Sequence, residues 1–147
     1  MAERAGLEAT SVDSFTLDPR LEAASHLVAD WPLCQVRLKD DTRFPWLLLI
    51  PRRRELVELT ELSPDDYATL NTEILRACHL LQAVARPKKL NVATLGNVVA
   101  QMHVHVIGRF ASDPAWPDAV WCHGNGPAYT PAERAAMLEQ LRAADAA

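Results

Sequence analysis

The stretch NVVAQMHVHVIGRF, residues 97–110, alternates polar and apolar side chains through its second half. Because successive side chains of a strand point to opposite faces, the alternation predicts a strand over residues 101–110. One face holds Gln101, His103 and His105, and the other holds Met102, Val104 and Val106. Neighbours on the polar face are about 7 Å apart. We expect the apolar face to enter the core and the polar face to form a site or a polar surface.

Three further strands are predicted around this one. The segment LCQVRLKD, residues 33–40, alternates apolar and polar side chains. FPWLLLIPR, residues 44–52, is an apolar run with prolines near both ends, where lost backbone donors are tolerated. KLNVATL, residues 89–95, precedes the opening stretch, and Gly96-Asn97 predicts a tight connection between these two strands.

Three helices are predicted, each from a capping residue followed by proline at the first helical position. The three pairs are Asp18-Pro19, Ser63-Pro64 and Thr130-Pro131. Apolar residues at helical spacing extend the first helix to Val28, and the second is a long amphipathic helix that ends at Arg86-Pro87. The third begins with a capping box and runs toward the C-terminus.

Length and element order indicate the class of fold. A chain of 147 residues, 49% hydrophobic and 23% charged, fits one compact domain. Strands joined partly by hairpins and partly by a long helix predict an α+β fold, with a mostly antiparallel sheet of about five strands and the helices on one face. Residues 1–16 are small, polar and aperiodic, so we predict a flexible N-terminal arm before a single domain over residues 17–147.

Composition argues against several classes of function. The formal net charge of -4 argues against broad electrostatic binding to nucleic acid. The first residues lack the apolar core of a signal peptide, and the longest apolar run, WLLLI, is too short to cross a bilayer. Three widely spaced cysteines without a CxxC pair favour reduced thiols. We therefore expect a cytoplasmic protein that binds neither nucleic acid nor membrane.

Three explanations compete for the polar row of Gln101, His103 and His105. The row can be the solvated face of an antiparallel sheet. It can bind a metal, since neutral imidazoles are common ligands, but a third ligand is then needed and His123 is the histidine best placed to reach. The third explanation is nucleophilic catalysis on phosphorus, in which one imidazole attacks and a neighbouring donor stabilises the oxygens.

The motif QMHVHVI, residues 101–107, resembles the signature of the histidine triad (HIT) family of nucleotide hydrolases and transferases, in which histidines alternate with hydrophobic residues. The order of elements from about residue 33 to residue 110 resembles that family too. The resemblance implies a HIT-like fold and points to a bacterial branch that has glutamine in place of the first histidine.

The resemblance also implies roles for single residues. His103 matches the nucleophile that attacks the α-phosphorus and becomes a nucleotidyl-histidine, and His105 matches the histidine that binds a non-bridging oxygen. Gln101 matches the residue beside the leaving group, where an amide can donate a hydrogen bond but carries no titratable proton at neutral pH. The implied nucleotide-binding positions are Asn91, Gly96, Asn97 and Trp46, the last standing where the family has a further histidine.

The function that follows is a nucleotide-binding hydrolase or transferase. It would act at the α-phosphorus of a nucleoside phosphate, phosphoramidate or dinucleoside polyphosphate, with no cofactor and no resident metal. The alternative is a non-catalytic nucleotide-binding module. The resemblance further implies a homodimer, for which the apolar stripe from Tyr67 to Leu81 and the loop tryptophans offer surface.

Overall fold

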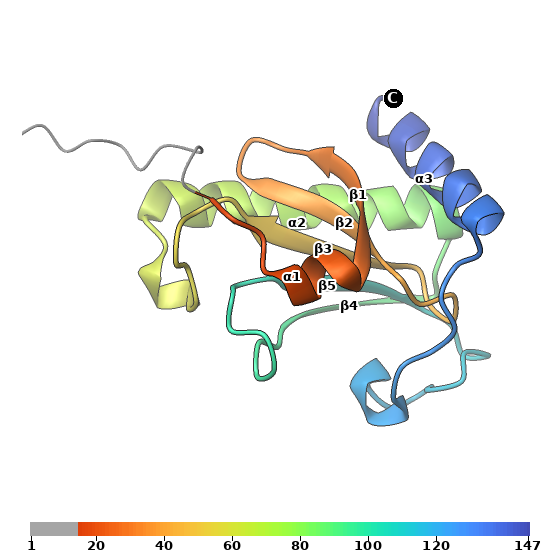
Figure 1. Cartoon of the computed structure of the whole chain (residues 1–147). Helices are drawn as coiled ribbons and strands as arrows, with labels where there is room; N and C mark the ends of the chain where they lie inside the picture. Colours follow the sequence, from red (N-terminus) through yellow and green to blue (C-terminus); the bar gives the residue numbers. More distant parts are fainter. Residues whose placement is uncertain (1–14) are drawn as a thin grey trace, which may run out of the picture.

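The structure is a computed structural model that describes residues 15–147. Most of the predicted N-terminal arm, residues 1–14, lies outside the described residues. The elements in chain order are α1 (Pro19–Ala23), β1 (Ser25–Asp30), β2 (Cys34–Lys39), β3 (Trp46–Pro51), α2 (Pro64–Ala85), β4 (Lys89–Thr94), β5 (Val104–Arg109) and α3 (Pro131–Asp145), with short 3-10 helices at Leu59–Glu61 and Val120–His123 (Figure 1).

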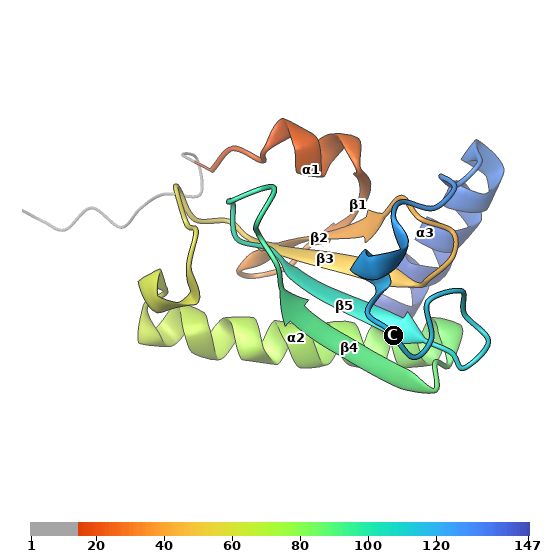
Figure 2. The same cartoon turned by 90° about the horizontal axis from the view of Figure 1, so that it is seen from below.

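The strands form one five-stranded sheet in the order β1-β2-β3-β5-β4. Every neighbouring pair is antiparallel, which confirms the predicted α+β class and sheet type. All six residues of the central strand β3 are buried, as an apolar run without alternation indicates. The strands β1 and β4 are the two edges of the sheet (Figure 2).

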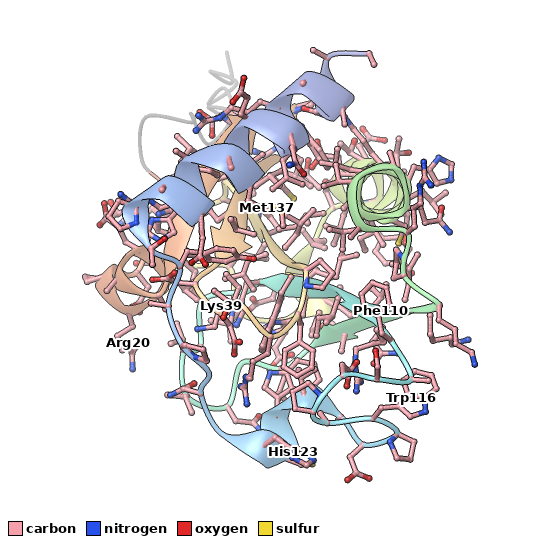
Figure 3. The ribbon with its side chains drawn as sticks, turned by 90° about the vertical axis from the view of Figure 1, so that its right-hand side faces the viewer. Arg20, Lys39, Phe110, Trp116, His123 and Met137 are labelled. Carbon is pink, nitrogen blue, oxygen red and sulfur yellow. The ribbon has the colours of Figure 1, made fainter. Side chains whose placement is uncertain are left out.

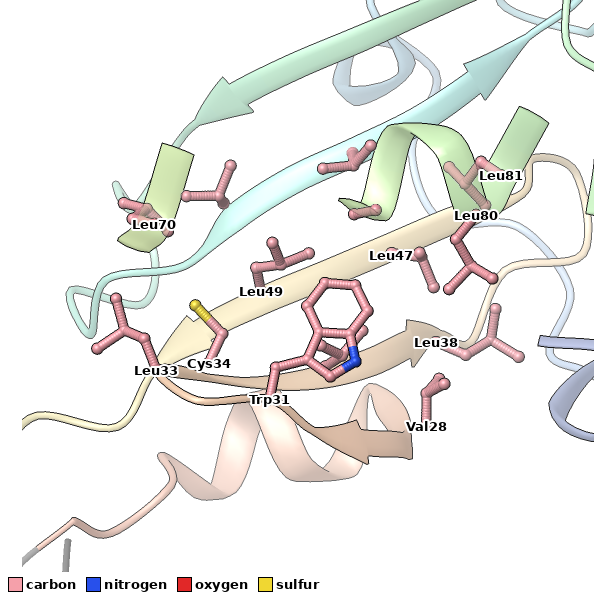
Figure 4. Packing of buried hydrophobic residues seen from close by; sticks show 14 of the residues in the cluster. Val28, Trp31, Leu33, Cys34, Leu38, Leu47, Leu49, Leu70, Leu80 and Leu81 are labelled. Carbon is pink, nitrogen blue, oxygen red and sulfur yellow. The ribbon is translucent and has the colours of Figure 1, made fainter. Parts of the chain in front are cut away.

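The two long helices cover one face of this sheet, as predicted, but α1, which was expected on the same face, packs on the other. A core cluster joins α2 and α3 to the side chains of the strands that point toward them (Figure 4). Its members include Met102, Val104 and Val106, so the apolar side of the opening stretch is confirmed as a core surface. A second cluster, which includes Leu21 and Trp46, packs α1 and the segment after β5 onto the opposite face.

The two long helices have the ends that their sequences predict. The Ser63 hydroxyl accepts a hydrogen bond from the Asp66 amide, and Arg86 closes α2 in the left-handed conformation. Thr130 and Glu133 form the predicted capping box of α3. Within the stripe expected to offer dimer surface, Leu70 and Leu81 are buried against the chain's own sheet, whereas Tyr67 is 52% exposed.

The first helix is shorter than its periodicity predicts. It ends at Ala23, and Val28, expected on that helix, lies instead on the edge strand β1. The reason is tertiary: residues of β1 pair with β2 from Ser25↔Lys39 to Asp30↔Gln35, and the ladder satisfies their backbone groups. The sequence reading of a helix through Val28 was therefore wrong, and His26 belongs to a strand.

The predicted tight connection at Gly96-Asn97 was also wrong. Strand β4 ends at Thr94 and β5 begins at Val104, so a loop over residues 95–103 joins them. The two strands still pair, with Thr94 opposite Val104 at the mouth of the loop. Gln101 and His103, which the alternation placed inside the strand, lie in this loop just before β5.

Two observations concern the environment of the chain. None of the helices in residues 15–147 combines the length and the apolar character that a membrane span requires. The cysteines Cys34, Cys78 and Cys122 are unbridged, and burial raises the pKa of the Cys34 thiol far above its usual range.

Candidate functional site

A cavity of about 350 Å³ opens on the face of the sheet opposite α2 and α3. Elements from both halves of the chain form its walls, because the antiparallel order brings β2, β3 and β5 together under α1 and the 95–103 loop. The lining residues that carry polar or aromatic groups are Arg20, Lys39, Trp46, Asn97, His103, His105, Trp121 and Asn125. A volume of this size suits a small organic ligand.

His103 enters this cavity with one ring nitrogen already engaged. Its Nδ1 lies 2.7 Å from the carbonyl oxygen of Gln101, and only a protonated Nδ1 can make that contact attractive. In the neutral ring the proton therefore lies on Nδ1, and the lone pair lies on Nε2. His103 is 6% exposed, so the hydrogen bond fixes the orientation of a nearly buried imidazole.

His105 has the opposite arrangement. The indole Nε1 of Trp46 donates a hydrogen bond of 3.0 Å to His105 Nδ1, which must then be unprotonated. The proton of the neutral ring lies on Nε2, a buried atom that makes no hydrogen bond of good geometry within residues 15–147, although the nearby Leu95 backbone opposes the effect of burial and acts to raise the pKa of the ring. Burial, followed by the neighbouring His103, lowers the pKa of His105 to about 3, so the ring stays neutral at physiological pH.

Aromatic rings pack the two histidines together. The ring centroids of His103 and His105 are 4.8 Å apart, which confirms that both side chains lie on one face. Trp121 makes an edge contact with His105 at 5.0 Å and with Trp46 at 6.0 Å. The two histidines of the polar row are thus packed against aromatic side chains and nearly buried, so they do not form a solvated sheet face.

The Gln101 side chain does not join the histidines. Its Oε1 accepts a hydrogen bond from the Asp18 amide at 2.8 Å, and its Nε2 donates to the Thr16 carbonyl at 2.8 Å. It lines a separate cavity with Thr16 and the segment Arg53 to Glu55. What Gln101 brings to the site is its backbone carbonyl, which holds His103.

The other predicted nucleotide-binding residues divide into two groups. Trp46 and Asn97 line the main cavity, and Gly96 lines a smaller space of about 180 Å³ that shares His103 with it. Asn91 lies away from both, where its Oδ1 accepts a hydrogen bond from Arg109 at 2.9 Å. Arg109 and Asp113 form a buried ion pair at 2.8 Å that anchors the segment after β5.

Four of the polar or aromatic lining residues were not predicted from the sequence, namely Arg20, Lys39, Trp121 and Asn125. Lys39 had a usable signal, since it continues the alternation of Gln35 and Arg37 along β2 on the face that turned out to hold the histidines. Arg20 and Trp121 had none, because each reaches the cavity from a segment whose position depends on the tertiary fold. Figure 3 shows Lys39 on the side of the sheet that also holds Trp116 and His123.

The metal explanation required a third ligand beside the two histidines. Within residues 15–147, no three side chains of His, Cys, Asp or Glu gather closely enough to hold a metal ion. His123 lies instead beside Asp118 in an exposed contact, with 3.4 Å between the imidazole and the carboxylate.

Comparison with known proteins gives consistent matches. Residues 20–112 match the family model of the HIT domain. A histidine triad (HIT) protein from Sinorhizobium meliloti 1021 is 38% identical, with 89% of this chain and 97% of that chain covered and a TM-score of 0.86. A histidine triad protein from Bradyrhizobium japonicum is also 38% identical, with 88% and 97% covered and a TM-score of 0.85.

A third solved structure, a histidine triad protein from Marinobacter aquaeolei VT8, is 34% identical, with 89% of this chain and 96% of that chain covered and a TM-score of 0.86. The chain therefore corresponds to almost the whole length of each of these bacterial proteins. No curated protein matches the sequence.

Proposed function

Because the chain belongs to the histidine triad (HIT) family, we propose that it is a nucleotidyl hydrolase or transferase that acts at the α-phosphorus of a nucleotide through His103. The family consists of nucleotide-binding hydrolases and transferases. The substrate classes proposed are nucleoside phosphates, phosphoramidates and dinucleoside polyphosphates. We further propose that the chain belongs to a bacterial branch of the family that has glutamine at the first position of the motif.

The hydrogen bond between His103 Nδ1 and the Gln101 carbonyl is the observation that carries this proposal. It leaves the Nε2 lone pair free toward the cavity, as a nucleophile requires. Attack forms a bond from Nε2 to the α-phosphorus and breaks the bond to the leaving-group oxygen or nitrogen. The ring becomes cationic, and the Gln101 carbonyl stabilises that charge through the Nδ1 proton. Water or another acceptor then displaces the nucleotide from His103.

His105 supplies the complementary group. Its Nε2 proton is a buried donor without a partner in the described part of the chain, so a non-bridging phosphate oxygen would satisfy it. A donor that is already oriented does not have to reorganise as charge develops on that oxygen. Trp46 acts through His105 by fixing which nitrogen carries the proton.

A non-catalytic nucleotide-binding module is the second candidate. The observation that favours it is the side chain of Gln101, whose two amide atoms bond to the backbone of Thr16 and Asp18 and not to the cavity. The position from which the family assists the leaving group therefore has no titratable proton. Such a protein would bind nucleotides without forming a covalent intermediate.

Covalent labelling separates these two functions. The protein is incubated with an adenosine 5′-phosphoramidate and quenched, and intact mass is measured for an acid-labile adenylyl adduct. Wild type should form the adduct, and His103→Asn should form none while it keeps its affinity for adenosine 5′-monophosphate. His79→Asn, which alters an exposed histidine of α2, serves as the matched control and should be labelled normally. An equally labelled His103→Asn would sink the proposed mechanism.

We also propose a twofold-symmetric homodimer and a cytoplasmic location. The two edges of the sheet support a particular dimer. Arg142 of α3 donates hydrogen bonds to the carbonyls of Leu27 and Val28 and so covers part of β1. Strand β4 carries the exposed Val92 at the other edge, where a second copy could continue the sheet.

A further inference from the structure

We propose that the preferred nucleotide has a second phosphate on its ribose and that Lys39 binds it. This inference rests on the proposed function, since it assumes that the α-phosphate lies at His103. Lys39 would then be a residue that determines specificity, at the end of the cavity that holds the nucleoside.

The strand register separates Lys39 from the nucleophile. His105 lies opposite Leu48, and His103 precedes β5, on the side of His105 away from the Trp46 level. Leu38 lies opposite Leu47, so Lys39 is level with Trp46. The levels of Leu48 and Trp46 are two residues apart, or about 7 Å at the usual rise of a strand. The charge of Lys39 still reaches His105 and adds to burial and to His103 in lowering the pKa of that ring. Lys39 therefore enters the cavity at the end remote from His103, where the sugar or base of a nucleotide attached at the α-phosphate would lie.

The ammonium group of Lys39 has no counterion of its own. Within residues 15–147 it forms no ion pair and no side-chain hydrogen bond, and its Nζ lies 5.9 Å from the centroid of the Trp46 ring. Arg20, the other cation of the cavity, already pairs with Asp18 at 2.9 Å. Burial lowers the pKa of Lys39, and the charges of Asp41 and Asp40 oppose that change. A half-buried cation in this position favours an anionic ligand.

The two carboxylates next to Lys39 in the sequence are engaged elsewhere. Asp41 forms a 2.8 Å ion pair with Arg43 and accepts a hydrogen bond from the Gly126 amide. Asp40 accepts from the Tyr129 amide at 2.9 Å. Among the described residues, no Asp or Glu lines the cavity. A carboxylate at this end would recognise free ribose hydroxyls, whereas a cation accommodates a ribose phosphate.

Binding of three products provides the test, because none of them has a leaving group. Calorimetry compares adenosine 5′-monophosphate with adenosine 2′,5′-bisphosphate and adenosine 3′,5′-bisphosphate. One of the bisphosphates should bind wild type about 10- to 100-fold more tightly than the monophosphate, as one added charge-assisted hydrogen bond permits. Lys39→Met should lose this preference and keep the affinity for the monophosphate, while Lys39→Arg should retain part of it. Lys89→Met, at an exposed lysine of β4, should behave as wild type.

The outcomes distinguish this inference from the function on which it rests. If wild type binds all three nucleotides with equal affinity and His103 is still labelled, the proposed function stands and the proposal of a ribose phosphate is overturned. Equal losses for the monophosphate and the bisphosphates in Lys39→Met would assign Lys39 to the 5′-phosphate and also overturn it. If a bisphosphate is preferred but His103 is not labelled, the result would support a ribose-phosphate site at Lys39 in a protein that binds nucleotides without catalysis. Absence of binding by any of the nucleotides would remove both proposals.

Discussion

His103 and His105 hold their protons on opposite ring nitrogens, although they are two residues apart on one strand end. The backbone carbonyl of Gln101 selects the Nδ1 proton in His103, and the indole of Trp46 selects the Nε2 proton in His105. One imidazole thus presents a lone pair to the cavity and the other presents a donor. Nucleophilic attack on a phosphate ester requires both groups, because the lone pair attacks phosphorus and the donor stabilises the negative charge on the oxygens.

The neutral state of His105 predicts a pH dependence of folding. Its pKa falls from the ordinary 6.5 to about 3 in the folded chain, so the unfolded chain binds this proton first as the pH falls. Stability is then lost below pH 6.5, by about 2 kcal/mol between pH 7.5 and pH 5.

The variant His105→Asn should not lose this stability at low pH, because asparagine has no group that titrates in this range. Urea unfolding of both proteins at the two pH values should show the wild-type advantage shrinking by about 2 kcal/mol at pH 5. An advantage of the same size at both pH values would mean that His105 titrates normally in the folded protein.

A second prediction concerns Gln101, where a histidine would restore the full motif. Both amide atoms of Gln101 bond to the backbone of Thr16 and Asp18, so the position faces that segment and not the reacting phosphate. Gln101→His should therefore change turnover little, and not by the roughly 100- to 10,000-fold that a general acid contributes.

The measurement is turnover of two nucleotides that differ only in the pKa of the leaving group. Gln82→His, at an exposed position of α2, is the control. A large acceleration by Gln101→His that is confined to the poorer leaving group would contradict the expectation.

The residue alternation predicted that Val104 and Val106 enter the core, because this is a consequence of strand geometry alone. It also predicted the directions of Met102 and His103, which keep the alternation although they precede β5. It could not predict the turn of the Gln101 side chain. That position lies outside β5, and its partners are backbone groups of Thr16 and Asp18, which are more than 80 residues away in the chain. Lys39 was within reach of the same alternation, but Arg20 and Trp121 were not.

At the scale of elements, capping residues defined α2 and α3 correctly because the signals and their acceptors lie within one turn. The predicted continuation of the first helix to Val28 was wrong because pairing with β2 outweighed the local periodicity. The predicted tight connection at Gly96-Asn97 was wrong because a Gly-Asn pair is compatible with a tight turn but does not require one, and a loop over residues 95–103 stands in its place. Non-local pairing and loop length are what local patterns leave undetermined.

The segment after β5 depends on a buried ion pair. Asp113 accepts from the Arg109 guanidinium and from the amides of Phe110, Ala115 and Trp116, and the Arg109 bond is the main cause that lowers the Asp113 pKa to about 2. Asp113→Asn should lower the free energy of unfolding by about 3 kcal/mol at pH 7, because it leaves a buried guanidinium without its counterion.

The pH dependence of this difference has a fixed sign. A carboxyl with a lowered pKa stabilises the fold above its unfolded pKa, near 3.8, and that contribution is lost as the pH falls toward 2. The gap between wild type and Asp113→Asn should therefore narrow below pH 4 in denaturant titrations. Asp118→Asn, at an exposed aspartate of the same segment, should change little at any pH. If the difference in the free energy of unfolding between wild type and Asp113→Asn is the same at every pH, the destabilisation would come from packing alone.

At the scale of the whole molecule, the open edge at β4 predicts how two copies meet. Light scattering at micromolar concentration should give twice the mass of the chain. Val92→Lys should shift the equilibrium toward monomer, because a charge at the exposed Val92 opposes edge-to-edge pairing. Leu27→Lys, at the similarly exposed Leu27 of β1, is the matched control and should remain dimeric. A wild-type protein that is monomeric would exclude this assembly.

The hydrogen bonds from Arg142 to the Leu27 and Val28 carbonyls affect how many copies of the chain can join through the edges of the sheet. A sheet with two open edges can add copies at both ends without limit, as fibres do, since each addition exposes a new edge identical to the first. Because β1 is partly occupied by the C-terminal helix, the proposed pairing of two copies at β4 would leave no equivalent edge behind. Polymerisation would then stop after one step, and a helix far from the histidines would keep the proposed assembly finite.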